Sequence, residues 1–248
     1  NKKIVMIILY RVIINLIFLF SPLIIILRIF KSKEDPRRFK EKFCFFSKNR
    51  KHGKLIWFHG ASVGELQSIV PLLEKLDKDF KIKQILVTSN TLSSSKIISK
   101  FRFKKVIHQF FPIDTNLLSL KFLDYWRPSA AFFVDSEIWP NTIINLKNKR
   151  IPLVLLNARI TKKSFDKWKF VDFFSKSIFS KIDLCIPSNN RSKNYLKQLG
   201  ARNIKLFGNL KYSQSENDKI KIDSSLKDFI QSRKAWCASS THQTEELF

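Results

Sequence analysis

Cysteine is scarce in this 248-residue chain, which contains only Cys44, Cys185 and Cys237, far apart and without a CxxC pair. Such spacing argues against a disulfide framework or a zinc site, and it fits a reducing compartment. Signatures of several enzyme classes are also missing, because the chain contains no Walker sequence, no GxGxxG and no GxSxG. Their absence disfavours NTPases, dinucleotide-dependent oxidoreductases and serine hydrolases.

Acidic residues are few, since 20 Asp and Glu stand against 46 Lys and Arg and give a formal net charge of +26. This excess favours an anionic partner, such as nucleic acid, an acidic membrane surface or a phosphorylated substrate. Much of it is Lys spread along the chain, so solvated side chains account for part of the charge, which alone selects no partner. The apolar fraction of 44% supports a hydrophobic core.

The N-terminal segment is almost entirely apolar from Ile4 to Leu27, interrupted by Arg11, Asn15 and Pro22. A helix of that length measures roughly 36 Å, which is enough to cross a hydrocarbon core of about 30 Å. We therefore predict a membrane-anchor helix in residues 1–30, with a helix lying in the membrane interface as the alternative. Arg11 lies near one end of the segment, where we expect its side chain to snorkel.

A basic segment, residues 31–53, follows the anchor. The cations around this boundary are Arg28, Lys31, Lys33, Arg37, Arg38, Lys40 and Lys42. The positive-inside tendency places this flank, and the globular part after it, on the cytoplasmic side of the membrane. The same cations favour contact with an anionic inner-membrane surface.

Beyond Lys54, short β-type runs alternate with helical stretches. Strands are predicted near residues 54–58, 84–88, 106–111, 130–134, 152–156, 183–187 and 204–208. The intervals leave room for one helix each, which predicts βαβ crossovers and an α/β domain with a Rossmann-like parallel sheet. We assign this domain to residues 54–212. A polar linker is predicted at residues 213–233, and residues 234–248 resemble the start of a second α/β domain.

The stretch HGASVGE, from His59 to Glu65, joins an apolar strand to a helical stretch that we expect over Leu66 to Leu76. Two glycines, including Gly64, let the backbone pass close to a ligand, and Glu65 stands where the helix begins. Ser62 and Glu65 also fit a capping box, so plain helix capping is the alternative. The helix dipole favours the ionised form of Glu65, which suits a general base. His59 is interpreted as a satisfied loop histidine.

Further polar residues follow other predicted strands, at the sheet edge where open α/β sheets bind ligands. Asp135 and Glu137 have a spacing that resembles a metal-binding D-x-D, but a substrate-positioning or structural role is favoured because no third ligand is visible. Arg159 suits a carboxylate or phosphate, although a surface salt bridge explains it equally well. Lys211 has the same two interpretations.

Eight pieces of this sequence together resemble a known family. They are DPRRFKEKF after the apolar anchor, WFHGASVGEL, ILVTSNT, FFPID, WRPSAAFFVDSEIWPN, PLVLLNARI, FGNLKY and ASSTHQTEE. In this order, and over essentially the whole chain, they resemble the 3-deoxy-D-manno-octulosonic acid (Kdo) transferases of lipopolysaccharide assembly. The family is similar in fold to two-domain GT-B glycosyltransferases, whose N-terminal domain binds the acceptor. The chain would then be a fragment, inactive alone, that contains only the start of the donor-binding domain.

The resemblance implies an inverting, metal-independent transfer of Kdo from CMP-Kdo to a phosphorylated lipid A precursor, without a cofactor. It implies a location at the cytoplasmic face of the inner membrane, and no nucleic acid partner. Glu65 matches the family's catalytic base. Acceptor-binding or supporting positions are Ser62, Gly64, Glu137, Arg159 and Lys211, and donor-binding positions are Ser240, Thr241 and His242.

Two alternatives remain open from the residues themselves. The first is another GT-B transferase that uses a different nucleotide sugar. The second is a non-catalytic basic module that binds a membrane surface or nucleic acid, for which binding would weaken steeply as the salt concentration rises.

Overall fold

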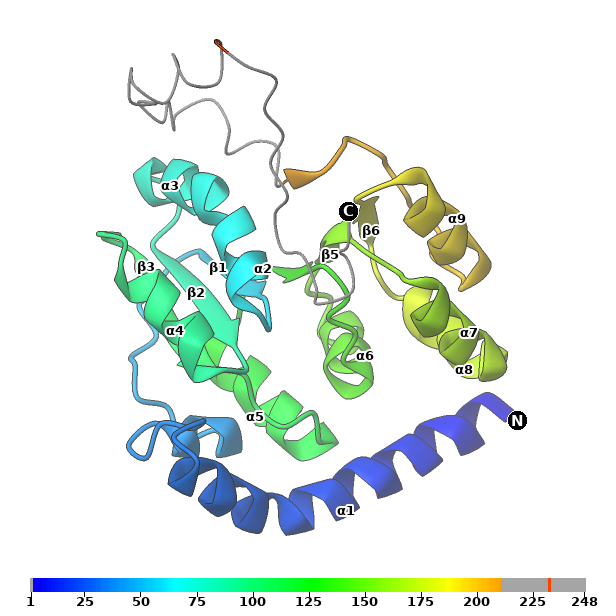
Figure 1. Ribbon diagram of the computed structural model, residues 1–248, viewed down its shortest axis with the longest axis horizontal. Coiled ribbons are helices and arrows are strands. Elements are labelled where there is room, and N and C mark those ends of the chain that lie inside the picture. Colours follow the sequence, from blue (N-terminus) through cyan, green and yellow to red (C-terminus); the bar gives the residue numbers. More distant parts are fainter. Residues whose placement is uncertain (1, 211–231, 233–248) are drawn as a thin grey trace. The chain divides into compact units, whose positions relative to one another are not determined.

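A computed structural model of the chain describes residues 2–210 and residue 232. The predicted linker and second domain therefore lie outside the described residues, apart from residue 232, and their boundaries stay predictions. Lys211, Ser240, Thr241 and His242 lie outside as well. The described part is an α/β structure (Figure 1).

Six parallel strands form one sheet in the order β3-β2-β1-β4-β5-β6. Their bounds are β1 Leu55–His59, β2 Gln84–Ser89, β3 Val106–Phe110, β4 Ala130–Val134, β5 Leu153–Ala158 and β6 Leu184–Pro187. The predicted Rossmann-like parallel sheet is confirmed. This order places β1 at the centre, with the chain extending first to one side and then to the other.

The seventh predicted strand, at residues 204–208, is wrong. Only an isolated parallel bridge joins Ile204 to Cys185. Phe207 is 73% exposed, and Gly208 has a φ of +101°. Residues 205–208 form no ladder with β6 beyond that bridge, and the φ of Gly208 lies outside the β region.

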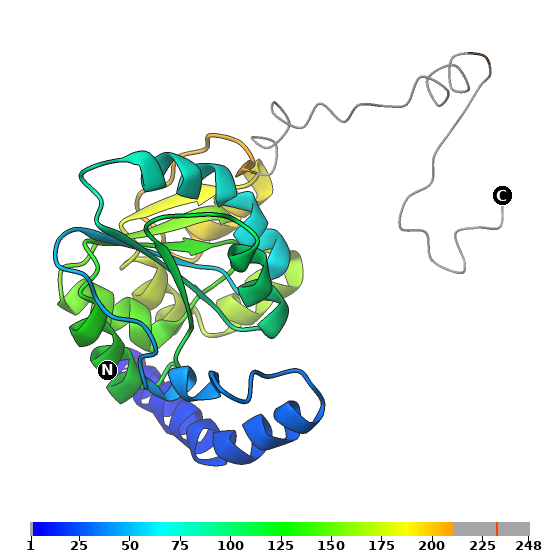
Figure 2. The ribbon, with the colours of Figure 1, turned by 90° about the vertical axis from the view of Figure 1, so that its left-hand side faces the viewer.

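Helices follow the strands in chain order. Their bounds are α1 Lys2–Phe30, η1 Phe39–Phe43, α2 Val63–Ser68, α3 Val70–Lys78, α4 Leu92–Ser99, α5 Asn116–Trp126, α6 Pro140–Asn148, α7 Lys162–Phe170, α8 Asp172–Phe179 and α9 Asn190–Gln198. Figure 2 shows helices on both faces of the sheet. Five of the described helices begin at an N-cap residue whose side chain accepts a backbone N–H of the first turn. These N-cap residues are Ser62, Thr91, Thr115, Thr161 and Asn189. These caps stabilise helix starts directly after the strand ends.

The helix expected over Leu66 to Leu76 is divided into α2 and α3 at Ile69. Pro71 lies in the first turn of α3. Because proline has no backbone N–H, it cannot continue the hydrogen-bond ladder of α2, although it fits the first turn of a new helix. The division leaves α2 as a short helix whose first turn carries Glu65.

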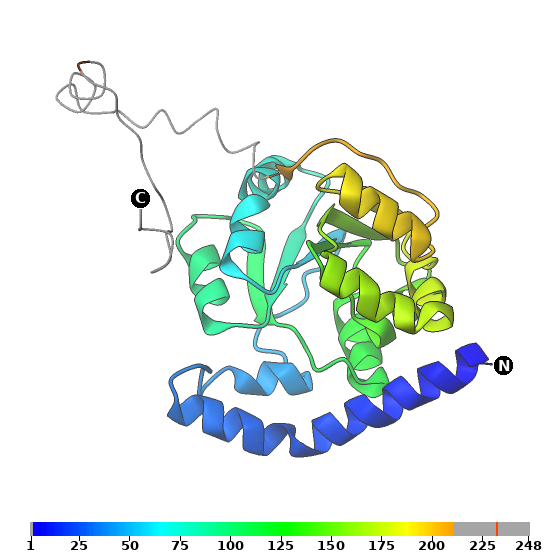
Figure 3. The ribbon, with the colours of Figure 1, turned by 45° about the vertical axis from the view of Figure 1, so that its right-hand side comes forward.

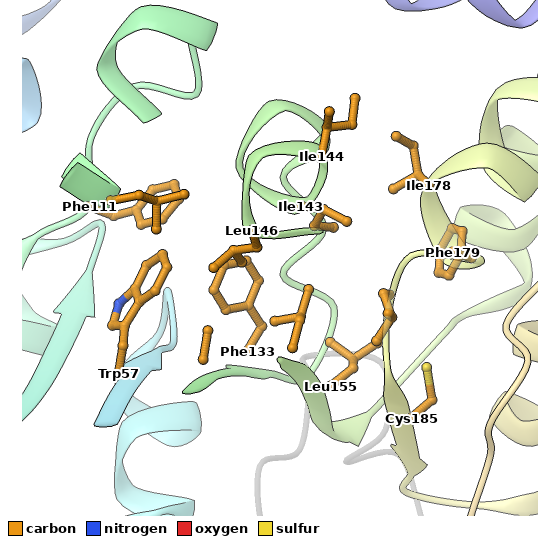
Figure 4. Close-up of a cluster of buried hydrophobic side chains, with 14 of the residues drawn as sticks. Trp57, Phe111, Phe133, Ile143, Ile144, Leu146, Leu155, Ile178, Phe179 and Cys185 are labelled. Atoms are coloured by element: carbon orange, nitrogen blue, oxygen red, sulfur yellow. The ribbon is translucent and has the colours of Figure 1, made fainter. Parts of the chain in front are cut away.

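Strand β1 is buried on both faces. Leu55 and Trp57 contribute to one hydrophobic cluster, while Ile56 and Phe58 contribute to the other. The Trp57 ring lies 4.9 Å from that of Phe122 and 5.1 Å from that of Phe133 between ring centroids. Figure 4 shows this cluster continuing to side chains of α6 and α8. Burial of each large apolar side chain contributes about 1.5–3 kcal/mol, so this core holds the central strand firmly.

Helix α1 lies along the domain and not apart from it (Figures 1 and 3). The Tyr10 hydroxyl donates to Asp114 Oδ2 at 2.8 Å. Arg11 donates from Nε to Asn141 Oδ1 at 3.0 Å and from Nη2 to Asn116 Oδ1 at 2.9 Å. The expected snorkelling of Arg11 is therefore wrong, because its guanidinium is turned toward α5 and α6.

The side of α1 that does not contact the domain is apolar. Its segment Ile4–Phe30 has a mean hydropathy of 2.6 and is long and apolar enough to cross a membrane. Half or more of the surface of several side chains is exposed there, among them Val5, Ile8, Val12, Leu16, Leu19, Phe20, Leu23, Leu27 and Phe30. This composition gives modest support for a membrane anchor.

Candidate active site

The carboxyl ends of β1 and β4 form the topological switch point of the sheet. The chain runs from β1 to β2 on one side, whereas β4 lies on the other side of β1. Open α/β sheets bind ligands at such a point, because the connections after the two strands run in opposite directions. Glu65 follows β1, and Asp135 and Glu137 follow β4. The predicted acidic residues thus lie on the two sides of the switch point.

Glu65 is held by the loop that precedes α2. Its Oε2 accepts the Ala61 backbone N–H at 2.7 Å, and its Oε1 accepts the Ser62 hydroxyl at 2.8 Å. Ser62 is the N-cap and accepts the Glu65 N–H at 3.3 Å. The arrangement differs from an ordinary capping box, in which the glutamate binds the N–H of the cap residue itself. Both carboxylate oxygens are therefore oriented by the loop.

Burial raises the pKa of Glu65, and the negative charges of Glu137 and Asp135 raise it further, while the hydrogen bonds from Ser62 and Ala61 act in the opposite direction. The expectation that the helix end would favour the ionised form is wrong in sign, because desolvation and like charges outweigh the local donors. A raised pKa brings a carboxylate closer to the range in which it accepts a proton effectively.

The two glycines of the loop have different roles. A Cβ on Gly60 would lie 3.0 Å from Leu66 Cδ2 and 3.3 Å from Glu65 Cβ, which is a tight contact with two side chains of α2. A Cβ on Gly64 would meet nothing within 4 Å. Gly60 thus packs closely against Leu66 and Glu65, while Gly64 leaves open space above the first turn of α2.

Glu137 is bound by two side chains. Its Oε2 lies 3.0 Å from His59 Nε2 and accepts Trp139 Nε1 at 2.8 Å. The His59 side chain is fully buried, and that of Glu137 is 15% exposed. The sequence identified only His59, as a satisfied loop histidine. It missed that both His59 and Trp139 hold Glu137, because nothing in the spacing relates positions 59 and 137.

The hydrogen bonds of His59 determine where a proton lies. Its Nδ1 faces the Thr88 carbonyl at 3.2 Å and the Thr88 hydroxyl at 3.0 Å. That hydroxyl donates to the Phe58 carbonyl, so Nδ1 is the donor toward Thr88. The other ring nitrogen, Nε2, lies 3.0 Å from Glu137 Oε2, and the Trp139 Nε1–H donates both to Nε2 at 3.1 Å and to Oε2 at 2.8 Å. His59, Glu137 and Trp139 thus form one hydrogen-bonded group.

Arg159 is not joined to Glu65 or Glu137 by any described contact. Arg159 follows β5, is exposed, and makes no ion pair with the described residues. Asp135 has a φ of +60°, and its Oδ1 accepts the Ser136 hydroxyl at 3.2 Å. Within residues 2–210 and residue 232, no group of three or more His, Cys, Asp or Glu is placed to hold a metal ion.

The fold and site together define a Rossmann-like α/β protein with acidic residues at its switch point. A family model described as 3-deoxy-D-manno-octulosonic-acid transferase (kdotransferase) matches residues 37–214. The chain therefore belongs to the Kdo transferase family, whose members are glycosyltransferases.

Relatives in other organisms agree with this assignment. A Kdo transferase of Rickettsia bellii is 35% identical over 236 residues, which are 92% of this chain and 56% of the relative. A probable mitochondrial Kdo transferase of Arabidopsis thaliana is 34% identical, with 96% of this chain and 56% of the relative covered. A Haemophilus influenzae Kdo transferase is 29% identical, with 94% and 56% covered. The chain thus spans about half the length of the curated relatives it matches.

Among solved structures, a UDP-N-acetylglucosamine 2-epimerase from Rickettsia bellii is similar with a TM-score of 0.47 at 16% identity, covering 65% of this chain and 46% of that chain. A UDP-GlcNAc 2-epimerase from Neisseria meningitidis bound to UDP-GlcNAc is similar with a TM-score of 0.47 at 14% identity, covering 72% and 53%.

Proposed function

We propose that this chain supplies the acceptor-binding side of an enzyme that transfers Kdo from CMP-Kdo to a phosphorylated lipid A precursor. The observation that carries the proposal is the environment of Glu65. Its carboxylate is oriented by Ala61 and Ser62 at the switch point, and its pKa is raised by burial and by Glu137. An oriented, half-buried carboxylate with open space above Gly64 suits proton abstraction from a bound hydroxyl.

In the proposed step, an acceptor hydroxyl oxygen attacks the anomeric carbon of Kdo. The bond between that carbon and the phosphate oxygen of CMP breaks, and CMP leaves with the electron pair. The hydroxyl proton passes to Glu65, so charge and atoms balance. Attack opposite to the leaving group inverts the anomeric configuration, and we propose that no metal ion takes part.

Glu137 has a supporting role in this proposal. Its negative charge contributes to the raised pKa of Glu65, and its own position is set by His59 and Trp139. We therefore assign Glu137 to orienting the acceptor, and His59 to positioning Glu137. Arg159 and Lys211 are proposed to bind acceptor charge, and Ser240, Thr241 and His242 to bind the donor.

The full-length protein with Glu65→Gln tests the function directly. Glutamine keeps the size of the side chain but cannot accept the proton, so kcat for Kdo transfer should fall by about 10²- to 10⁴-fold. Glu74→Gln, which changes an exposed acid on α3, is the matched control and should keep normal turnover. Both variants should unfold at the same denaturant concentration as the parent. Transfer by the Glu65→Gln enzyme within about tenfold of normal would remove Glu65 from the role of base.

We also propose that α1 lies along the membrane surface at the cytoplasmic face of the inner membrane. Its polar contacts from Tyr10 and Arg11 hold it lengthwise against α5, α6 and the loop after β3. Crossing the bilayer would break these contacts and place Arg11 in hydrocarbon, which costs about 2.5–3.5 kcal/mol for the charge alone. The exposed apolar side of α1 is instead suited to burial at the boundary between head groups and acyl chains.

A further inference from the structure

A concave site whose lining does not include Glu65 or Glu137 lies between the end of α1 and the start of α4. The pocket has a volume of about 410 Å³, and its polar lining is provided by Arg28, Ser32, Lys33, Thr91, Ser93 and Lys96. Three of these six side chains are cationic, and the other three carry hydroxyl groups. Among the described residues, no acidic side chain lines the pocket. Its lining therefore suits an anion with several oxygen acceptors.

The positive charge of this pocket is only partly neutralised. Glu34 Oε2 lies 3.0 Å from Arg28 Nε and 2.7 Å from Lys42 Nζ, so one buried carboxylate serves two cations. Lys33 and Lys96 have no acidic partner within the part of the chain that the structure describes. Of the three cations that line the pocket, Lys33 and Lys96 thus remain unopposed, and Arg28 shares its carboxylate with Lys42. Like charges held together repel each other, and an anion that enters the pocket relieves that repulsion.

The pocket is also connected to the switch-point loop. Helix α4, which supplies Thr91, Ser93 and Lys96 to the region, carries Ser94, whose hydroxyl donates to the Ala61 carbonyl at 2.9 Å. Ala61 in turn donates its N–H to Glu65. A ligand bound at the start of α4 is therefore one hydrogen-bonded link away from the residues that orient Glu65.

We propose that this pocket binds a phosphate monoester, carried on the head group of a membrane lipid. Arg28 ends the apolar helix α1, so the pocket opens where an apolar surface gives way to cations. A phospholipid has the matching arrangement, because its apolar acyl chains give way to a charged phosphate. A monoester carries more negative charge than a diester and exposes three oxygens, which matches three cations and several hydroxyls. Binding at this pocket would hold the acceptor of the proposed function. Only the identification of this lipid as the acceptor rests on that function, because the site itself follows from its lining residues.

Isothermal titration calorimetry on the whole chain in a nonionic detergent tests the site. Dioctanoyl phosphatidic acid supplies the lipid monoester, dioctanoyl phosphatidylglycerol the diester, and glycerol 3-phosphate a soluble monoester. Lys33→Gln/Lys96→Gln should weaken binding of phosphatidic acid about thirtyfold, since each charge near a lipid surface is worth about 1 kcal/mol. Lys100→Gln changes an exposed lysine at the end of α4 outside the pocket, and should alter affinity less than about twofold.

The outcomes separate the possibilities. Loss of phosphatidic acid binding in the Lys33/Lys96 double variant, with phosphatidylglycerol binding weakly throughout, supports the site. If glycerol 3-phosphate binds as tightly as phosphatidic acid, and loses as much affinity in the double variant, the pocket binds a soluble phosphate monoester. That result would overturn the lipid source. Equal affinities of the double variant and Lys100→Gln for phosphatidic acid would overturn the site itself. Because no Kdo or CMP is present, failure here leaves transfer through Glu65 untouched.

Discussion

At the residue scale, Glu65 is the side chain whose interpretation the structure changes most. The sequence left it between a helix cap and a base, and the structure shows that its carboxylate oxygens bind Ala61 and Ser62 while its pKa is raised. Capping and the proposed base role are therefore compatible, because the Ser62 side chain caps the helix. The pKa of Glu65 is raised by burial and by acidic neighbours in the loop after β4, which local spacing cannot reveal.

The acid limb of the pH profile of kcat/KM should depend on the charges of Glu137 and Asp135. In the proposed mechanism Glu65 must be ionised to accept the proton, so kcat/KM should fall as the pH drops through its raised pKa. Glu137→Gln and Asp135→Asn each remove a negative charge that raises that pKa, so both should move the acid limb to lower pH. The shift should be larger for Glu137→Gln, because its charge has the larger effect. Asparagine tolerates the positive φ of residue 135.

The measurement is kcat/KM across pH in the full-length protein. Glu74→Gln again serves as control and should leave the acid limb in place. A limb that stays fixed in both acidic variants, or moves to higher pH, would show that the limb does not report Glu65.

At the element scale, Asp114 fastens three elements together. Its two carboxylate oxygens accept the Tyr10 hydroxyl of α1, the backbone N–H groups of Asn141 and Thr142 at the start of α6, and the Thr142 hydroxyl. The sequence contained Asp114 only as part of the piece FFPID. Its role as the point that joins α1, α6 and the loop after β3 depends on contacts 27 to 104 residues apart.

Asp114→Asn should therefore destabilise the domain. Asparagine has one acceptor oxygen, so two of the four donors lose their partner, and each buried unsatisfied donor costs about 1–3 kcal/mol. We expect a loss of about 2–5 kcal/mol in the free energy of unfolding, measured by chemical denaturation. Asp124→Asn, which removes only an exposed ion pair with Lys149, should change it by less than about 1 kcal/mol. Equal effects of the two substitutions would contradict the role of Asp114.

At the scale of the whole molecule, α1 is part of the domain and not a detached anchor. Ile25 is 5% exposed, and Met6, Ile7 and Phe18 contact the large hydrophobic cluster. One helix thus has one side that packs on the protein and another that is apolar and exposed. This division supports a helix lying in the membrane interface, which the sequence ranked second.

Nitroxide labels at Val5, Leu16 and Leu27 should locate the helix in the bilayer. These positions are exposed, and their spacing of eleven residues places them on one side of α1 over about 33 Å of helix. An interfacial helix holds all three at a similar depth, so their accessibility to oxygen and to a water-soluble nickel reagent should agree. A graded series, with Leu16 deepest and both ends in water, would instead show that α1 spans the bilayer.

The sequence by itself determined the secondary structure and the place of the loops. Buried apolar runs such as AAFFV predicted the parallel strands, and polar residues directly after β1 and β4 predicted where a ligand would bind. These features depend on neighbouring residues, so they can be read from local pattern. The same reasoning was wrong at residues 204–208, where apolar composition suggested a strand but only an isolated bridge at Ile204 forms.

Only the tertiary structure decided which distant side chains meet. His59 faces Glu137, Arg11 faces the domain, and the cations near Arg28 share a pocket with Lys96. Each of these pairings depends on strand order and helix packing, which set distances between residues far apart in the chain. Burial and the charges of neighbours also set the pKa of Glu65, because both are properties of the folded surroundings and not of the residue.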